Sequence, residues 1–309
     1  MSMTLTEAAK LYAADPVRAA IIELYAAGSD ILAALPFNSI SGSALAYNRE
    51  ESLPGIGFRG VNGGYDESSG VINPISESLT IAGGDLDVDT FIIKTQGMGV
   101  RTTHEVMKMK ALALAWTRTF IKGNSAVDPL LFDGLQVRVA GDQKVAAGAT
   151  ANGDALSLAK LDEAIDNVVE PTHIIMSKAM RRKLSVAART GAVGGDLQWQ
   201  KVDFGKQVAF YNGIPILETD KDNVNVDILG FNEVCPGGGT LTGTSIYVIS
   251  LGDGKVSGIQ NGDPTAEDIG RLQTKQAYRT TVEWLSTITI YHPRAVVRIW
   301  GISDAPITN

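Results

Sequence analysis

The apolar positions between residues 101 and 122 recur with the spacing of a long amphipathic helix. Advancing about 100° per residue gathers the large apolar side chains in one arc of ~120°. That arc holds Val106, Met109, Leu112, Ala113, Trp116 and Phe120. The pattern predicts a helix that ends near Lys122 and turns one face toward a core.

The segment before this helix, residues 41–89, has a different pattern. Short alternating runs such as Gly55 to Arg59 are separated by turn signals at Asn62–Gly64 and at Ser68–Gly70. This pattern predicts a projecting β-hairpin over residues 41–89.

The predicted hairpin has few large apolar side chains for its length. Between Ser41 and Pro74 they are Leu45, Tyr47, Leu53, Ile56, Phe58, Val61, Tyr65, Val71 and Ile72. Their burial within the hairpin is too small a gain to offset the conformational entropy lost when so many residues are ordered. We therefore expect the hairpin to be ordered by lying on another copy of the chain.

The N-terminal forty residues carry helix signals. Thr4 to Glu7 forms a capping box, and Asp15–Pro16 starts an apolar run that ends at Gly28. These signals predict two short helices in an N-terminal arm over residues 1–40. After the hairpin, the apolar run from Phe91 to Ile93 is expected to enter a core.

Residues 127–276 have the pattern of a compact α/β module. Helices are predicted around residues 158–168 and from Ser177 to Thr190, and strands at 173–176, 208–211, 214–217 and 246–251. Two further β-prone runs, 280–291 and 295–300, are expected to pair with each other near the long helix. We therefore predict an α+β chain with an N-terminal arm (1–40), an extended loop (41–89), a peripheral domain with a spine helix (90–126), an inserted axial α/β domain (127–276) and closing peripheral strands (277–309).

Composition restricts the function classes. The chain has 309 residues and a net charge of −7, so its whole surface does not attract nucleic acid or anionic membrane. The single cysteine, Cys235, excludes an intrachain disulfide, and the N-terminus has no secretory signal pattern. The apolar runs are too short to span a bilayer. We expect a protein that assembles in a reducing cytoplasm and makes no membrane contact.

The cations of the long helix are the main local charge pattern. Arg101, Lys108, Arg118 and Lys122 fall in a second arc, away from the apolar one. This arc is either an ordinary solvated face, a set of salt bridges to neighbouring subunits, or a surface for non-specific, salt-sensitive contact with nucleic acid. The sequence leaves these alternatives open.

No catalytic, cofactor or metal signature is complete. His104–Glu105 begins a zinc-protease motif, but Lys108 stands where the second histidine belongs. Asp85, Asp87 and Asp89 begin a calcium-loop spacing without its glycine and its bidentate glutamate, so a solvated strand face is favoured. The glycine-rich run 237–243 lacks the spacing of a phosphate loop and is expected to be a surface loop. We therefore predict no enzyme.

The projecting hairpin carries the candidate contact residues. Positive, negative and apolar side chains occur together on it. This combination is expected for contacts that align one copy of the chain with the next. The predicted intersubunit contacts are Tyr47, Arg49, Glu50, Glu51, Ile56, Phe58, Arg59, Asp66 and Glu67.

The order of these elements resembles the major capsid protein of tailed bacteriophages, whose fold is shared with bacterial encapsulin nanocompartments. The resemblance covers nearly the whole chain. Its stretches are MKMKALALAWTRTFIKGN in the spine helix, PTHIIMSKAMRRKLSVAARTG and YNGIPILETD in the axial domain, IYVISLGDGKVSGIQNG near its end, and TTVEWLSTITIYHPRAVVRIWGI in the peripheral domain.

The resemblance implies a structural subunit that forms hexamers and pentamers in an icosahedral shell around double-stranded DNA. It also implies a portal and a possible decoration or cement protein. This chain has no lysine between Lys10 and Lys94, so the lysine crosslink in the extended loop of some relatives is not expected. Because the N-terminal arm is short, a separate scaffolding protein is expected. Two alternatives stay open: an encapsulin-like shell around enzyme cargo, and an α/β enzyme of unknown chemistry.

Overall fold

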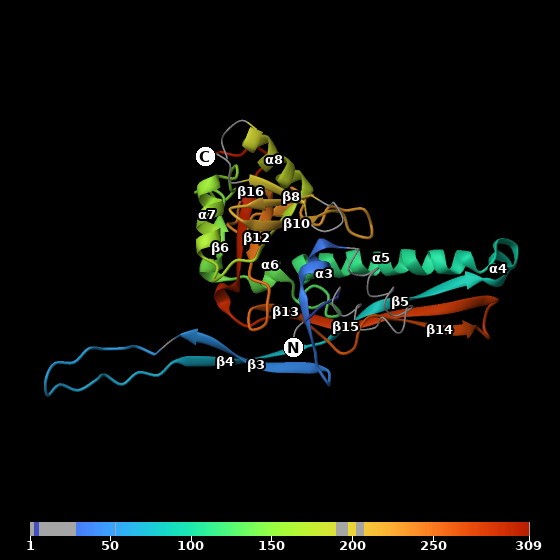
Figure 1. Ribbon diagram of the computed structural model, residues 1–309, viewed down its shortest axis with the longest axis horizontal. Coiled ribbons are helices and arrows are strands. Elements are labelled where there is room, and N and C mark those ends of the chain that lie inside the picture. The colour runs from blue at the N-terminus through green and yellow to red at the C-terminus, as the bar shows by residue number, and fades with distance from the viewer. Residues whose placement is uncertain (1–2, 6–28, 53, 190–196, 202–206, 309) are drawn as a thin grey trace.

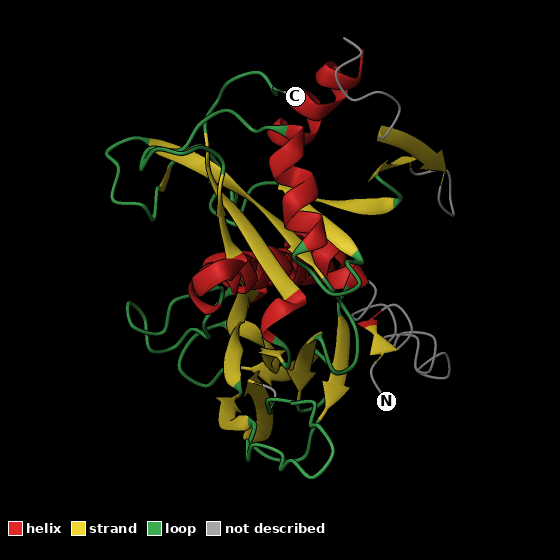
Figure 2. Cartoon of the chain, turned by 90° about the vertical axis from the view of Figure 1, so that its left-hand side faces the viewer, coloured by secondary structure: helices red, strands yellow, loops and turns green. Residues whose placement is uncertain are grey.

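The chain folds around two β-sheets and a separate two-stranded ribbon. The computed structural model describes residues 3–5, 29–52, 54–189, 197–201 and 207–308. Figure 1 shows an elongated molecule, with the ribbon projecting at one end of the long axis and a helical turn at the other. In Figure 2, which looks along that axis, the two sheets lie one above the other.

The spine helix α5 (Gly99–Lys122) confirms the helix predicted from the apolar spacing. Trp116 is at the centre of its buried face: the ring lies 5.5 Å from Phe120 and 5.4 Å from Trp284, and the indole N–H donates to the hydroxyl of Ser286. Val106 departs from the prediction, because it is 38% exposed. Among the apolar positions of the helix, burial therefore begins at Met109, about one turn later than the wheel indicates.

A short helix, α4 (Thr90–Gln96), precedes the spine helix and overturns one expectation. The run from Phe91 to Ile93 does not enter a core, because α4 has no buried residue and Phe91 is 72% exposed. The carboxylate of Asp89 accepts a hydrogen bond from the backbone N–H of Phe91 and caps the helix. The cap turns the chain out of its strand before the apolar run begins.

The first sheet lies beneath the spine helix. Its strand order is β1-β2-β13-β15-β14, with β5 along the other side of β15. The bounds are β1 (Met3–Thr4), β2 (Pro36–Ser39), β5 (Thr80–Asp89), β13 (Val256–Gln260), β14 (Thr265–Arg271) and β15 (Ala277–Ile290). The helix α3 (Asp30–Ala34) precedes β2. A Cβ at Gly258 would lie 2.3 Å from the ring of Phe37, so glycine is needed where β2 pairs in parallel with β13.

The second sheet has the order β6-β16-β12-β7-β10-β9-β8, and β11 pairs with β12. The strands are β6 (Lys144–Ala146), β7 (His173–Ser177), β8 (Leu197–Lys201), β9 (Gln207–Tyr211), β10 (Ile214–Thr219), β11 (Glu233–Val234), β12 (Thr242–Ile249) and β16 (Val296–Ile302). The helices are α6 (Leu135–Arg138), α7 (Leu158–Asp166) and α8 (Lys178–Arg189), with 3-10 turns η1 (Gly141–Gln143) and η3 (Pro293–Ala295). These elements confirm the strands and helices predicted between residues 158 and 251.

Strand pairing divides the chain differently from the predicted boundaries. β13 and β14 fall within 127–276, yet they pair with β15 in the first sheet. The expectation that residues 280–291 and 295–300 pair with each other is wrong, because β16 pairs with β12 and β6 in the second sheet. Local β-propensity marks a strand but carries no information about its partner. The turn at Pro293–Ala295 takes the chain from one sheet to the other.

The N-terminal segment is partly built into the core. The two helices predicted within residues 6–28 lie outside the described residues. In the described part, Leu5, Ile31, Leu32, Leu35 and Phe37 are all buried in the same core as Trp116. These parts of residues 1–40 therefore contribute to the first sheet and its core.

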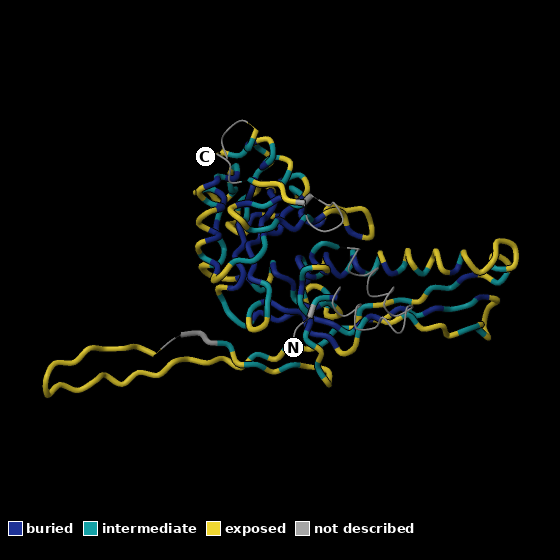
Figure 3. The backbone as a smooth tube through the Cα atoms, in the orientation of Figure 1, coloured by how far each residue is buried: buried dark blue, intermediate teal, exposed yellow. Residues whose placement is uncertain are grey.

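The ribbon formed by β3 (Ala44–Ser52) and β4 (Val71–Ser78) is antiparallel and confirms the predicted hairpin over residues 44–78. We call residues 44–78 the arm, residues 44–49 and 73–78 the arm root, and residues 54–70 the arm tip. Residues 80–89, predicted as part of the same loop, form β5 and pair with β15. Figure 3 shows the arm tip exposed along its whole length.

Candidate functional site

The arm tip presents apolar side chains that its own chain does not cover. Every residue from 54 to 70 is exposed. Phe58 is fully exposed, and Ile56 and Val61 are 89% and 95% exposed. Several large apolar side chains exposed on one short segment make it a candidate contact site. The free backbone groups along such a ribbon add hydrogen-bonding capacity to that site.

Local contacts give the tip a defined turn. Asn62 has a positive φ of 63°, and the N–H of Gly63 donates to the carbonyl of Gly60. The guanidinium of Arg59 lies 5.2 Å from the ring centre of Tyr65 and donates to the carbonyl of Gly63. The tip therefore has a shape of its own, although it does not contact the body.

The predicted contact residues fall into two groups. Ile56, Phe58, Arg59, Asp66 and Glu67 all lie on the exposed arm tip, where another molecule can reach them. They come from both sides of the turn, so one partner surface can engage apolar and charged side chains together.

The remaining predicted contacts lie at or near the root. Tyr47 contacts its own chain: its hydroxyl donates to the carbonyl of Ile290 at 3.2 Å, and its ring centre lies 4.7 Å from that of Tyr291. Arg49 is half-buried on the same strand. The side chains of Glu50 and Glu51 lie outside the described part of the chain. Tyr47 is therefore an intrachain anchor in this subunit, and its role as an intersubunit contact stays a prediction.

Sequence reasoning missed the other anchor of the root. Glu77 on β4 receives two hydrogen bonds from the guanidinium of Arg138 on α6, one of 2.7 Å to Oε2 and a shorter one to Oε1. The Nε of Arg138 also donates to the carbonyl of Asp133. Burial, and secondly the negative charge of Glu77, raise the pKa of the Tyr47 phenol. The alternation of the large side chains Leu45 and Tyr47 with smaller residues was the available signal for an inward-facing side of this ribbon.

The cations of the spine helix do not form a free basic face. Arg101 is only 6% exposed, lies 2.5 Å from the carboxylate of Asp268 and donates to the hydroxyl of Thr280. Its pKa is raised, chiefly by the hydrogen bond to Asp268, and the same bond lowers the pKa of Asp268. The helix therefore uses its first cation to hold the first sheet.

The other cations of this arc are also engaged within the chain. Arg118 lies 3.0 Å from the carboxylate of Asp222, and Lys122 lies 3.2 Å from that of Glu233. Lys108 lies along the backbone of β5, where a Cβ at Gly84 would come within 2.8 Å of its ammonium nitrogen. Three of the four residues thus make salt bridges, but to carboxylates of the same subunit, which none of the three alternatives predicted.

The carboxylates of β5 are paired as well. Asp87 accepts two hydrogen bonds from the guanidinium of Arg279 and forms an ion pair with Lys275. The carboxylate of Asp85 lies 2.8 Å from the same guanidinium. These contacts lower the pKa of Asp87 far below its usual range. Asp85 and Asp89 are exposed, as expected for a solvated strand face, whereas Asp87 is partly covered by its pairing with Arg279 of β15 and with Lys275 just before that strand.

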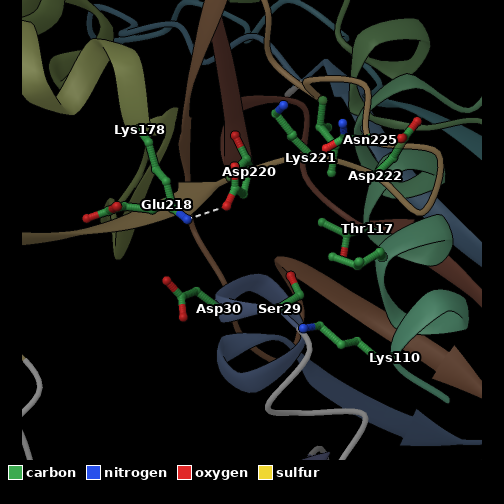
Figure 4. Close-up of a pocket in the computed structure, with 13 residues that line it drawn as sticks. Ser29, Asp30, Lys110, Thr117, Lys178, Glu218, Asp220, Lys221, Asp222 and Asn225 are labelled. Atoms are coloured by element: carbon green, nitrogen blue, oxygen red, sulfur yellow. Dashed lines mark hydrogen bonds and ion pairs between the residues drawn. The ribbon is translucent and has the colours of Figure 1, made fainter. Parts of the chain in front are cut away.

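A polar cavity of about 480 Å³ lies between α3, α5 and the loop after β10 (Figure 4). Lysines and carboxylates alternate around it, and several are already paired: Lys178 with Asp220, and Asp222 with Arg118. Asp222 also accepts hydrogen bonds from two backbone N–H groups of its own loop. The cavity therefore has the character of an ion-pair junction between elements.

The glycine-rich run 237–243 has a structural role. In the run 237–243, the N–H of Leu241 donates to Asn152, and a Cβ at Gly239 would lie 2.2 Å from the same side-chain oxygen. The glycines thus allow an exposed loop to approach residues 151–152 closely.

Within the described ranges, no three side chains are grouped as metal ligands. In the same part of the chain, helices capable of crossing a bilayer are absent.

Comparison with known proteins gives matches in structure only. No protein-family model and no curated protein matches the chain by sequence. Among solved structures, a protein of Mycobacterium phage Bobi is 12% identical, with a TM-score of 0.62 over 88% of this chain and 90% of that one. The holo-SrpI encapsulin of Synechococcus elongatus PCC 7942 is 16% identical, with a TM-score of 0.59 over 87% and 86%. A virus-like particle from Pyrococcus furiosus is 12% identical, with a TM-score of 0.53 over 92% and 97%.

Proposed function

The chain has the α+β fold that phage capsid proteins and encapsulin share, and we propose that it is the major capsid protein of a tailed double-stranded DNA bacteriophage. Its role is structural: copies form hexamers and pentamers that close into an icosahedral shell around the genome. The observation that carries this proposal is the arm tip, which is exposed over residues 54–70 and extends away from the body.

The shape of the subunit supports assembly through unlike surfaces. The arm lies at one end of the long axis and the spine helix extends toward the other (Figure 1). A patch at one end that binds a different patch on the next copy gives a heterologous contact, and such contacts close into rings when the rotation between copies allows. Exposed apolar side chains on the arm tip supply contact area. The charges of Arg59, Asp66 and Glu67 align the tip on the neighbouring copy.

The proposal gives each region a part in the shell. The sheet under the spine helix corresponds to the peripheral domain, and the sheet containing β7, β12 and β16 corresponds to the axial domain. The particle assembles in the bacterial host cytoplasm with a separate scaffolding protein, a portal and, where present, a decoration or cement protein. The arm contains no lysine, so its contacts are non-covalent. Because three cations of the spine helix are already paired, packaged DNA is contacted non-specifically and weakly by this face.

An encapsulin-like nanocompartment is the second candidate, favoured by the likeness to the Synechococcus elongatus encapsulin. The two candidates share the shell and differ in its contents. Particles that enclose nucleic acid, encoded beside portal and terminase genes, support the phage proposal. Particles that enclose an enzyme support the nanocompartment.

Electron microscopy of the purified full-length chain tests shell formation. We expect closed spherical particles of uniform diameter, either from the chain alone or after co-expression with the scaffolding protein encoded beside it. A discrete monomer or small oligomer under both conditions, with a ligand in the polar cavity beside Lys110, would contradict the proposal and favour an enzyme.

A further inference from the structure

The two halves of the arm differ in how they contact the rest of the subunit. In the root, half-buried residues alternate with exposed ones along each strand. The strand register places Tyr47 opposite Ile75 and Leu45 opposite Glu77. Directly opposed residues of an antiparallel pair lie on the same face. One face of the root therefore lies against the body, whereas the tip has no such face.

The root is attached at two separate elements. Tyr47 contacts the end of β15 through its hydroxyl and its ring, and Glu77 contacts α6 through the two-bond pair with Arg138. One contact is on β3 and the other on β4, so both strands of the ribbon are attached. Two contacts, on different strands of the ribbon and to different elements of the body, restrict rotation of the ribbon. A single contact would leave the ribbon free to rotate about that point.

The pair between Glu77 and Arg138 is suited to this role. The two side chains are 15% and 13% exposed, so water competes weakly for their hydrogen bonds. A paired fork of this kind fixes direction as well as distance, because both carboxylate oxygens face the planar guanidinium. Removal of one partner leaves the other charge buried without compensation.

The attachment ends where the strands become irregular. The register of β3 with β4 shifts between Glu50 and Ser52, and a bulge of this kind locally bends a ribbon. Beyond it, the described contacts of residues 54–70 are within the tip itself, such as the hydroxyl of Ser68 donating to the carbonyl of Gly55. The molecule thus has a held root, a bend and an uncovered tip.

We propose that Tyr47 and Glu77 are positioning residues that, with Tyr291 and Arg138, hold the arm at a fixed angle in the free subunit. The neighbouring copy then orders only the tip. This inference rests on the proposed function for the role of the tip, but the fixed angle is a property of the isolated chain. An arm that is already directed loses less conformational freedom on docking and presents the tip at one angle to the next copy. Shell curvature is then uniform.

The angle can be measured in the full-length, unassembled subunit with two spin labels. One label is placed at Ile72→Cys on the arm beyond the root and the other at Asp142→Cys on the body; the native Cys235 is buried and stays unlabelled. We expect a narrow distance distribution in the parent, a clearly broader one in Glu77→Gln, and an intermediate one in Tyr47→Phe, which loses the hydroxyl contact and keeps the ring.

The matched control is Glu67→Gln, the same chemical change on the same arm, but on the exposed tip. It should leave the distribution unchanged. If Glu77→Gln fails to fold, Arg138→Lys keeps the charge, loses the two-bond geometry and should broaden the distribution. Distributions in Glu77→Gln and Arg138→Lys as narrow as the parent's would overturn the proposal.

Hydrogen exchange gives a second readout of the same attachment. Amides of the root strands in Glu77→Gln should exchange on the order of tenfold faster than in the parent, with tip amides unchanged. Shells of Glu77→Gln, where they form, should vary in diameter. If the parent forms no shells, the proposed function fails, while the label distances still decide whether the root is held.

Discussion

The spine helix and the arm tip both carry large apolar and charged side chains. The helix buries or pairs most of these side chains within its own subunit, whereas the tip exposes them. The spine helix buries Trp116 in the core and pairs Arg101, Arg118 and Lys122 with carboxylates of its own chain. The tip leaves Phe58 and its neighbours uncovered. The helix is complete within one subunit, whereas the tip has surface that only another molecule can cover.

This difference locates the functions. Changes in the spine helix should act on the stability of the single subunit, because its partners are intrachain. Changes in the arm tip should act on association and leave the subunit's stability unaltered. A set of substitutions, ordered by the expected effect on the free subunit, tests this division.

The largest loss is expected for Trp116→Ala. Trp116 is 2% exposed, stacks on Phe120 and donates to Ser286, so its truncation should lower the free energy of unfolding by about 3–5 kcal/mol. Urea denaturation of the subunit measures this. The matched change on the arm, Phe58→Ala, should cost less than about 0.5 kcal/mol. Equal losses in the two variants would remove the contrast between the regions.

The next effect is expected at the C-terminal end of the helix, for Glu233→Gln. Glu233 is 6% exposed and lies 3.2 Å from both Lys122 and Arg298. Neutralising it leaves two cations without their counter-charge, and we expect a loss of roughly 3 kcal/mol in the free energy of unfolding. Thermal and urea unfolding beside Glu67→Gln, an exposed tip residue, provide the comparison. A loss of stability no greater than in that control would show that the ion pair between Glu233 and Lys122 does not stabilise the end of the helix.

A smaller, pH-dependent effect is expected for Asp268, the partner of Arg101. The pKa of its carboxyl is lowered in the folded chain, so its contribution to stability is present above the unfolded pKa of about 3.9 and is lost as pH falls through the lower folded value. Asp268→Asn should therefore be less stable than the parent at neutral pH. The gap should close in acid. A gap that persists unchanged below pH ~3 would contradict this assignment.

The fold could be predicted from the sequence where local pattern determines structure. The spacing from Met109 to Phe120 defines the helix, and the glycine and asparagine turns around Asn62 define the arm. Strand partners could not be predicted in this way: residues 280–291 and 295–300 have the same β-prone composition, yet they pair in different sheets. Partner choice depends on which apolar faces meet in three dimensions.

The candidate site was predicted in part for the same reason. Phe58 and Arg59 stand in a glycine-rich segment with too few large apolar side chains to form a core of its own, so their place on a projecting arm could be predicted from local pattern. Tyr47 and Arg101 have partners more than 150 residues away, at Ile290 and Asp268. Such partners are not visible in a single sequence, so the intrachain contacts of both residues could not be predicted.

The smallest effect on the free subunit, and the largest on assembly, is expected for Phe58→Asp. The side chain is fully exposed and contacts nothing in its own body, so unfolding should match the parent within about 0.5 kcal/mol. A carboxylate in place of the ring would be costly to bury against a neighbour. Electron microscopy should show soluble subunits and no shells. Normal particles would show that Phe58 is not at a contact.

The central claim, that the tip is covered only by another copy, is tested most directly by trypsin cleavage after Arg59, compared between free subunits and assembled particles at equal protein concentration. We predict rapid cleavage in the free subunit and strong protection in the particle. Equal cleavage in both states would contradict the account.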